Sequence, residues 1–233
     1  MKHVGFSTGA ISLGDFEQAI RLLHDLPGDA IELSALRVNE IGPLIAALPH
    51  LDLCRYEHIS IHLPSNFSAD EEAAIAELLW GLPRSWLLIL HPDVIHDFSI
   101  WRRFAGRVAI ENMDRRKSRG RTAEELDRCF TQLPEARLCF DIGHARQFDP
   151  SMAEAYLILS QFSDRLAQVH VSEVDSQSRH AVITYAAELA FREVAHMIPM
   201  VTPLILESRV LPEQIPSEMR RAFNLFRPSI FAT

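Results

Sequence analysis

The stretch "LCFDIGHA", residues 138–145, runs from apolar side chains directly into Asp141, and His144 follows three positions later. Side chains alternate between the two faces of a strand, so Asp141 shares one face with Cys139, while the neighbouring leucine and phenylalanine occupy the other. In a closed parallel sheet one face points into the barrel and the other packs against helices. The stretch therefore predicts a strand that ends on an inward carboxylate, a sharp turn at Gly143, and a return of His144 to the same mouth.

Seven other apolar runs have the length of a strand, and amphipathic stretches of helical length lie between them. The predicted strands cover residues 3–7, 30–34, 58–62, 86–91, 107–112, 137–141, 166–171 and 202–207. Helical patterns occupy, among others, residues 14–26, 68–79, 121–133 and 217–226. Within two of these patterns, Ser68 with Glu71 and Thr122 with Glu125 have the spacing of a capping box.

The regular alternation of strands and helices predicts the fold class. Eight units in 233 residues average roughly 29 residues each, which suits a βα unit with short loops. Strict alternation implies a parallel sheet, and eight units favour closure over an open doubly wound sheet. We therefore expect an α/β protein with a (β/α)8 TIM barrel, in which residues 1–233 form a single domain.

The composition restricts the classes of function. With 48% hydrophobic and 23% charged residues, the chain matches a globular protein with a sizeable core. No apolar run is long enough for a membrane span or a signal peptide, so we expect a cytoplasmic protein without membrane contact. The formal net charge of −8 argues against a general nucleic-acid binder. Cys54, Cys129 and Cys139 lack paired spacing, which predicts buried free thiols.

Asp141 is one of seven strand-end residues that the alternation points inward. The others are Glu32, His62, His91, Glu111, His170 and Glu207. One polar strand end ordinarily emerges into solvent, but seven would converge on the mouth where such barrels carry active sites. Clustered carboxylates repel one another, and a divalent cation removes that cost. Imidazole nitrogen and carboxylate oxygen together suit zinc, manganese or ferrous iron, with cobalt and magnesium as further candidates.

Six short motifs follow one another on successive predicted strands: "IHLP", "LHPD", "IENM", "CFDIGH", "VHVSE" and "LILES". In this order they resemble the xylose-isomerase-like barrels, which include endonuclease IV of AP endonuclease family 2 and many sugar isomerases, epimerases and inosose dehydratases. The similarity covers nearly the whole chain. It implies a metal cluster held by Glu111, Asp141, His170 and Glu207. It also matches His62 and His91 to a pair that joins Glu111 around another metal ion.

The resemblance matches His144 and His180 to ligands of a third metal ion in the endonuclease pattern. That pattern has an Asp-Arg-His step, where this chain has Ser178, Arg179 and His180, so one carboxylate ligand is missing. Two alternatives remain open. Asp175 replaces the missing ligand, or His144 and His180 bind substrate oxygens, as the histidine behind the aspartate does in the epimerase relatives.

The segment "DRRKSRGR", residues 114–121, gathers four arginines and a lysine after the fifth predicted strand of an otherwise acidic chain. A loop after a strand opens on the same mouth, so Arg115 and Arg116 are candidates for binding a phosphate or carboxylate of the substrate. The alternative is a solvated loop without a ligand. The candidate substrate-binding set is completed by Glu32, His144 and His180.

Two enzyme classes fit these residues. In the isomerase or epimerase interpretation, a metal ion binds the carbonyl and hydroxyl of a small sugar-like substrate or its phosphate, while Glu111 and Glu207 move protons. In the phosphodiesterase interpretation, two or three metal ions activate water and bind a phosphoryl group, which His62 and His91 favour. The acidic charge, the missing third-site carboxylate and the short loops favour the small substrate. A metal-binding barrel without turnover is the third hypothesis, and the oligomeric state stays open.

Overall fold

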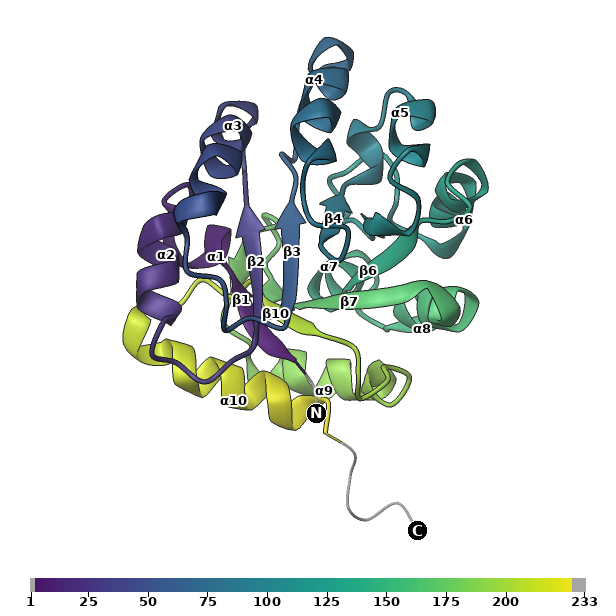
Figure 1. Cartoon of the computed structure of the whole chain (residues 1–233). Coiled ribbons are helices and arrows are strands. Elements are labelled where there is room, and N and C mark those ends of the chain that lie inside the picture. The colour runs from purple at the N-terminus through teal and green to yellow at the C-terminus, as the bar shows by residue number, and fades with distance from the viewer. Residues whose placement is uncertain (1–2, 228–233) are drawn as a thin grey trace.

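Eight parallel strands close into a barrel in the computed structural model, which describes residues 3–227 (Figure 1). The barrel strands are β1 (Val4–Ser7), β2 (Ala30–Ser34), β3 (His58–His62), β4 (Leu87–Leu90), β5 (Val108–Glu111), β6 (Arg137–Asp141), β7 (Leu166–Val171) and β10 (Leu204–Leu206). Each barrel strand pairs with the one before it, and β1 pairs with β10, for example Phe6 with Leu206, to close the ring. The predicted (β/α)8 barrel is confirmed.

The helices surround the barrel and cover the apolar outer face of its strands (Figure 1). They are α1 (Thr8–Ser12), α2 (Phe16–Leu23), α3 (Val38–Ala47), α4 (Ala69–Trp80), α5 (Phe98–Arg102), α6 (Ala123–Gln132), α7 (Ile142–Phe148), α8 (Ala153–Phe162), α9 (Tyr185–Ala195) and α10 (Ile215–Leu225). Outward residues such as Phe6 and Phe140 are completely buried between strands and helices. This burial is the main source of stability in such a fold. None of the helices within residues 3–227 combines the length and apolarity needed to cross a membrane.

On the side of the barrel formed by β4, β5 and β6, the interior changes from apolar to polar along the strands. An apolar layer consists of Leu87, Ile89, Ala109, Cys139 and Ala167. Because side chains on one face of a strand recur every second residue, the inward positions beyond this layer on β4, β5 and β6 carry the predicted site residues. The residues that fill the barrel and the residues that line its mouth therefore lie on the same inward face of these strands.

The predicted strand bounds hold for β2, β3, β6 and β7, and the other four strands are one or two residues shorter at their ends. His91 and Glu207 follow their strands directly, so they leave the backbone ladder at the mouth. Ser68 forms the predicted capping box, because its backbone N–H donates to Glu71 Oε2 at 2.8 Å. At the other predicted box only half is present: Thr122 Oγ1 accepts from the N–H of Glu125 at 3.2 Å.

The sharp turn predicted at Gly143 is wrong, because α7 begins directly after β6. Asp141 is the residue that caps this helix, and its Oδ1 accepts a hydrogen bond from the backbone N–H of His144 at 2.6 Å. Gly143 is needed for space instead: a Cβ there would lie 2.4 Å from the carbonyl oxygen of Ser172. Asp141 therefore ends β6 and caps α7, so no residues remain between the two elements to form the predicted turn.

Two features of the structure lie outside the predicted elements. A short antiparallel ribbon, β8 (Glu173–Val174) and β9 (His180–Ala181), follows β7 and carries His180 toward the mouth. Two residues per strand are too few to give a periodic signal. The second feature is Cys54, which is exposed, whereas Cys129 and Cys139 are the predicted buried free thiols. Cys54 lies in a polar loop, where its Sγ–H donates to Asp52 at 2.9 Å.

Candidate metal centre

Four side chains from four neighbouring strands meet at the C-terminal mouth of the barrel. Glu111 ends β5, Asp141 ends β6, His170 lies in β7, and Glu207 directly follows β10. One potential ligand atom of each lies within 4.8 Å of those of the other three. All four residues are buried. The structure thus brings together the quartet that the sequence assigned to a metal ion.

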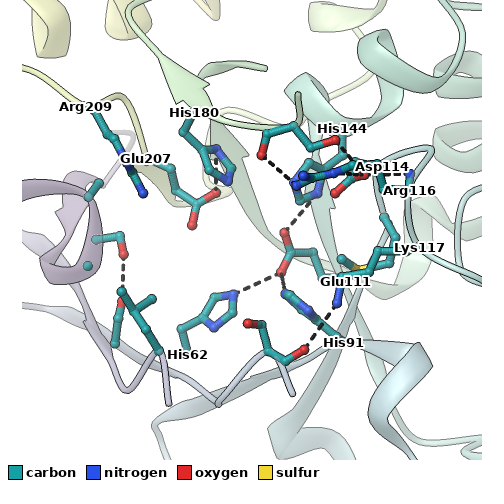
Figure 2. Close-up of a pocket in the computed structure, with 18 residues that line it drawn as sticks. His62, His91, Glu111, Asp114, Arg116, Lys117, His144, His180, Glu207 and Arg209 are labelled. Carbon is teal, nitrogen blue, oxygen red and sulfur yellow. Dashed lines mark hydrogen bonds and ion pairs between the residues drawn. The ribbon is translucent and has the colours of Figure 1, made fainter. Parts of the chain in front are cut away.

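Glu111 is the central residue of this mouth, as Figure 2 shows. Its Oε2 lies 3.2 Å from Nε2 of His62 and 3.2 Å from Nε2 of His91. Its Oε1 lies 3.3 Å from Nδ1 of His170 and 3.3 Å from Nδ1 of His144. His62, His91 and Glu111 form a second group with the spacing of metal ligands. One carboxylate is therefore shared between two potential ion sites.

Asp141, His144 and His180 form a third group of potential ligands at the side of the mouth. The rings of His144 and His180 lie 5.3 Å apart between centroids. Nδ1 of His144 is 3.0 Å from the carbonyl oxygen of Asn112, and Nδ1 of His180 is 2.8 Å from Oγ of Ser172. These contacts hold both rings in place before any ligand arrives.

Asp175 does not reach this third group. Its carboxylate is held on the surface by the guanidinium of Arg179 at 2.9 Å, so the replacement role proposed for it from the sequence is wrong. The carboxylate beside Ser178 is that of Asp114, whose Oδ1 accepts from Oγ of Ser178 at 2.7 Å. Asp114 also lines the cavity of the mouth. The sequence analysis missed it, although it follows Glu111 by three positions, in the loop directly after β5.

Two carboxylate oxygens of the mouth indicate whether a cation fits there. Oδ2 of Asp141 and Oε2 of Glu207 are buried and accept no hydrogen bond from any residue within 3–227. A buried carboxylate oxygen without a partner is costly, and a bound cation satisfies it. With imidazole nitrogens beside these oxygens, the donor set suits zinc, manganese or ferrous iron. The residues present therefore fit a divalent metal ion.

The two glutamates of the mouth differ strongly in acidity. Burial raises the pKa of Glu207 to about 8, against the opposing charge of His170. Burial also acts on Glu111, but there the charge of His170 and hydrogen bonds from the surrounding histidines outweigh it and hold the pKa well below its usual range. In the metal-free protein one carboxyl is thus ionised while the other keeps a proton at neutral pH.

The histidines of the mouth also differ in their pKa values. Although burial disfavours their charged forms, Glu111 raises the pKa of His62 to about 9, and Asp141 raises that of His144 to about 10. Burial lowers the pKa of His91, and burial with the neighbouring charge of His144 lowers that of His180 to about 3. Binding of a metal ion must therefore displace protons from some of these rings.

Glu32 lies deeper in the barrel than the sequence analysis placed it. It pairs with Ser60 rather than with the strand-end residue His62, and it has no exposed surface. Its Oε2 lies 2.9 Å from Nε2 of His170 and accepts from Nε2 of Gln168 at 2.8 Å. Glu32 therefore contacts a ligand candidate from below and does not line the cavity of the mouth.

The mouth contains a cavity of about 210 Å³ with cations at its rim (Figure 2). Arg116, Lys117 and Arg209 line it, together with His144, His180 and Glu207. Arg115 does not line it, and its Nη2 instead donates to the carbonyl oxygen of Ser176 at 3.3 Å. Arg209, which the sequence analysis did not select, makes no hydrogen bond or ion pair with another residue of the described chain. Because Arg209 follows the strand-end residue Glu207 by only two positions, the sequence could have placed it at the mouth.

Solved structures with the same barrel match nearly the whole chain. A xylose isomerase domain protein from Alicyclobacillus acidocaldarius has a TM-score of 0.64 at 13% identity, over 97% of this chain and 98% of that one. A candidate sugar phosphate isomerase/epimerase from Anabaena variabilis has a TM-score of 0.58 at 12% identity, over 94% and 88%. SacUVDE has a TM-score of 0.50 at 12% identity, over 96% and 98%.

These matches establish the TIM barrel as the fold, and they agree with the resemblance to xylose-isomerase-like barrels noted in the motifs. No protein-family model matches the sequence, and no curated protein matches it either. At 12–13% identity the structural likeness concerns the fold, so the chemistry has to be argued from the residues of the mouth.

Proposed function

We propose that this xylose-isomerase-like barrel is a metal-dependent isomerase or epimerase that acts on a small sugar or sugar phosphate. The observation that carries the proposal is the pair Glu111 and Glu207, which face one small cavity from β5 and from the end of β10. An epimerisation that removes a proton from one face of a carbon and returns one to the other face can use two such groups on either side of the substrate.

The two carboxyls are arranged for this task. Oε1 of Glu111 and Oε2 of Glu207 lie 3.3 and 3.4 Å from the same atom, Nδ1 of His170, so both groups reach the same part of the cavity. Their acidities are pushed apart in the metal-free protein, which is the usual mark of an acid and base pair. With its own proton displaced by the bound metal ion, Glu207 would take the substrate proton, and Glu111 would return one.

The metal ion would be held by Glu111, Asp141, His170 and Glu207, with zinc or manganese as the first candidates. When bound, it supplies Lewis-acid polarisation of a substrate carbonyl. The chain itself supplies the rest: buried walls exclude water, and His144 and His180 face the cavity as donors or acceptors for substrate hydroxyl groups.

The size and charge of the cavity define the substrate class. A volume of about 210 Å³ is below the roughly 300–1,000 Å³ of sites that hold drug-sized ligands, so the substrate is small. Arg116, Lys117 and Arg209 line the rim, and Arg209 has its guanidinium free within the described chain. Guanidinium groups bind phosphate or carboxylate through paired hydrogen bonds, so the rim suits a substrate with one anionic substituent.

A phosphodiesterase is the second candidate, and a specific observation favours it. Besides the quartet, the interior of the barrel contains three further potential ligand groups among the described residues: His62 with His91 and Glu111, Asp141 with His144 and His180, and, deeper, Glu32 with His62, His170 and Glu207. Several neighbouring metal ions are typical of enzymes that cleave phosphodiesters. The small cavity favours the isomerase, because a nucleic acid would need a longer groove.

Deuterium incorporation separates these candidates. Protein loaded with zinc, manganese, cobalt or magnesium is incubated in D₂O with a panel of aldoses, ketoses and their phosphates, and carbon-bound deuterium is followed by NMR. We expect incorporation with wild type and none with Glu207→Gln. Arg192→Gln, a surface change on α9, serves as the matched control.

A parallel assay with bis(p-nitrophenyl) phosphate and abasic DNA tests the second candidate. Phosphodiester cleavage without deuterium incorporation would replace the isomerase by the phosphodiesterase. Metal binding with neither activity would leave a non-catalytic barrel as the better description.

A further inference from the structure

A second cavity, of about 520 Å³, opens at the N-terminal end of the barrel, opposite the metal centre. It lies where three strands begin: Leu87 is the first residue of β4, Arg107 directly precedes β5, and Arg137 is the first residue of β6. Arg84 and Arg103 line it from the preceding loops. Among the described residues, no aspartate or glutamate lines this space, which we call the arginine cavity.

Three of the four guanidinium groups have no counter-charge. Arg103 pairs with Glu77 at 2.7 Å, but the side chains of Arg84, Arg107 and Arg137 form no ion pair or hydrogen bond with residues 3–227. Nε and Nη2 of Arg107 are buried without an acceptor. Buried donors ordinarily have a partner, so these two atoms indicate a missing acceptor. This gathering of cations occurs in a chain with a net charge of −8.

The backbone at this cavity is held in an unfavourable conformation. Ala105 has φ of 50°, in the left-handed region that residues other than glycine rarely adopt. It lines the cavity and begins the short 3-10 turn Ala105–Arg107 that leads into β5. Backbone strain of this kind tends to occur at binding sites. Here the strained turn carries Arg107 into the cavity beside the ring of Phe104, 5.7 Å from its centroid.

We propose that the arginine cavity is a binding site for a diphosphate group, either free or as part of a larger metabolite. One phosphoryl group carries about −1.5 to −2 charges at neutral pH, so two of them balance three guanidinium groups. Each guanidinium offers a planar pair of donors to phosphate oxygens. The indole of Trp80, which is 48% exposed at the wall, is placed to contact the remainder of a larger ligand.

This inference goes beyond the proposed enzyme activity and stands independently of it, because no residue is shared between the two cavities. A diphosphate at the starts of β4, β5 and β6 would join three αβ loops through one ligand. The site would therefore stabilise the end of the barrel opposite to the reaction.

Isothermal titration calorimetry with inorganic pyrophosphate tests the proposal on the full chain, with and without a chelator of divalent ions. We expect saturable binding in both conditions, weakened by added salt because the contacts are ionic. Arg107→Gln and Arg84→Glu should each weaken binding by about tenfold or more, as the loss of a hydrogen bond to a charged group implies. Arg84 is exposed, so its substitution leaves the core intact.

Two control variants locate the bound anion. Arg192→Gln removes the same charge from the surface of α9 and should leave pyrophosphate binding unchanged. Arg209→Gln removes a cation from the opposite mouth, and it should leave unchanged the pyrophosphate binding that depends on Arg84 and Arg107. Absence of saturable binding, or a loss caused by Arg209→Gln but not by Arg107→Gln, would overturn the proposal.

A second titration with ADP distinguishes the two sources of the group. Equal affinity for ADP and pyrophosphate identifies the diphosphate alone as the recognised chemistry. Tighter binding of ADP that is lost in Trp80→Ala extends the site to a nucleotide. Binding of orthophosphate as tight as that of pyrophosphate would contradict a site for two phosphoryl groups.

Discussion

The two ends of the barrel differ in whether their charged side chains have partners of opposite charge. At the C-terminal mouth, carboxylates and histidines lie within hydrogen-bonding reach of one another, as where Glu111 meets His62 and His91 at 3.2 Å. At the N-terminal end, Arg84, Arg107 and Arg137 face one cavity without a partner among residues 3–227. The mouth can therefore select a cation by ligand geometry, whereas the arginine cavity attracts an anion by uncompensated charge. Each of the following changes should affect the mouth and spare the arginine cavity.

Glu111→Gln is expected to have the largest effect, because this candidate ligand contacts four histidines of the mouth, His62, His91, His144 and His170. Turnover by the proposed isomerase should fall by about 10²–10⁴-fold, the usual contribution of one acid or base group. Metal content per chain, measured by elemental analysis, should fall as well. The affinity for pyrophosphate should stay at the wild-type value. An unchanged metal content would remove Glu111 from the centre.

Glu207→Gln should separate metal stabilisation from folding. A ligand present at 100 times its Kd stabilises the folded state by about 2.7 kcal/mol, and the amide should lose most of that gain. Without metal, the variant should melt at the same temperature as wild type or higher, because the buried Glu207 has to take up a proton on folding and glutamine does not. Paired thermal melts with and without zinc measure both effects. Equal metal-dependent gains in the two proteins would exclude Glu207 as a ligand.

The double substitution of His62 and His91 by alanine tests whether the second ligand group is used. These rings lie 5.0 Å apart and share Oε2 of Glu111. If they hold an ion of their own, metal content should fall by about one equivalent while the quartet keeps its ion. Unchanged stoichiometry together with a higher KM would instead assign both rings to substrate binding.

The stability of the metal-free protein should fall as the pH rises from about 6.5 to about 9. Glu207, with a folded pKa of about 8, and His62, with one of about 9, both hold protons that the unfolded chain has already lost. Their stabilisation is complete below the unfolded pKa values and disappears as the pH passes the folded ones. Each proton that the folded chain holds and the unfolded chain lacks contributes about 1.4 kcal/mol per pH unit to the slope.

Urea unfolding at a series of pH values, in the presence of a chelator, measures this slope. Saturating zinc should flatten or reverse it, because metal binding replaces those protons. A metal-free protein whose stability increases over this range would contradict the protonation states described for the mouth.

The sequence predicted the barrel and most of its mouth because both follow from one regular signal. Alternation with a period of two reports which strand residues point inward, and the strand ends of a closed barrel converge without further information. Asp114 and Arg209 lie in loops, where no period applies. The arginine cavity was not predictable either, because Arg84, Arg107 and Arg137 come from three separate connections that only the closed sheet brings together.

The short ribbon β8–β9 and its turn are held against α7, because Nη1 of Arg146 pairs with Glu173 at 2.9 Å and Nε2 of Gln147 donates to Oγ of Ser178 at 3.0 Å. A two-stranded ribbon of this size is barely stable alone, and His180 is joined to the barrel mainly by Ser172, at 2.8 Å. A ligand held jointly by His144 and His180 would add to these contacts with α7. Amide hydrogen exchange in residues 173–181 would then slow in proportion to occupancy, so exchange in the ribbon reports how long a ligand stays at the mouth.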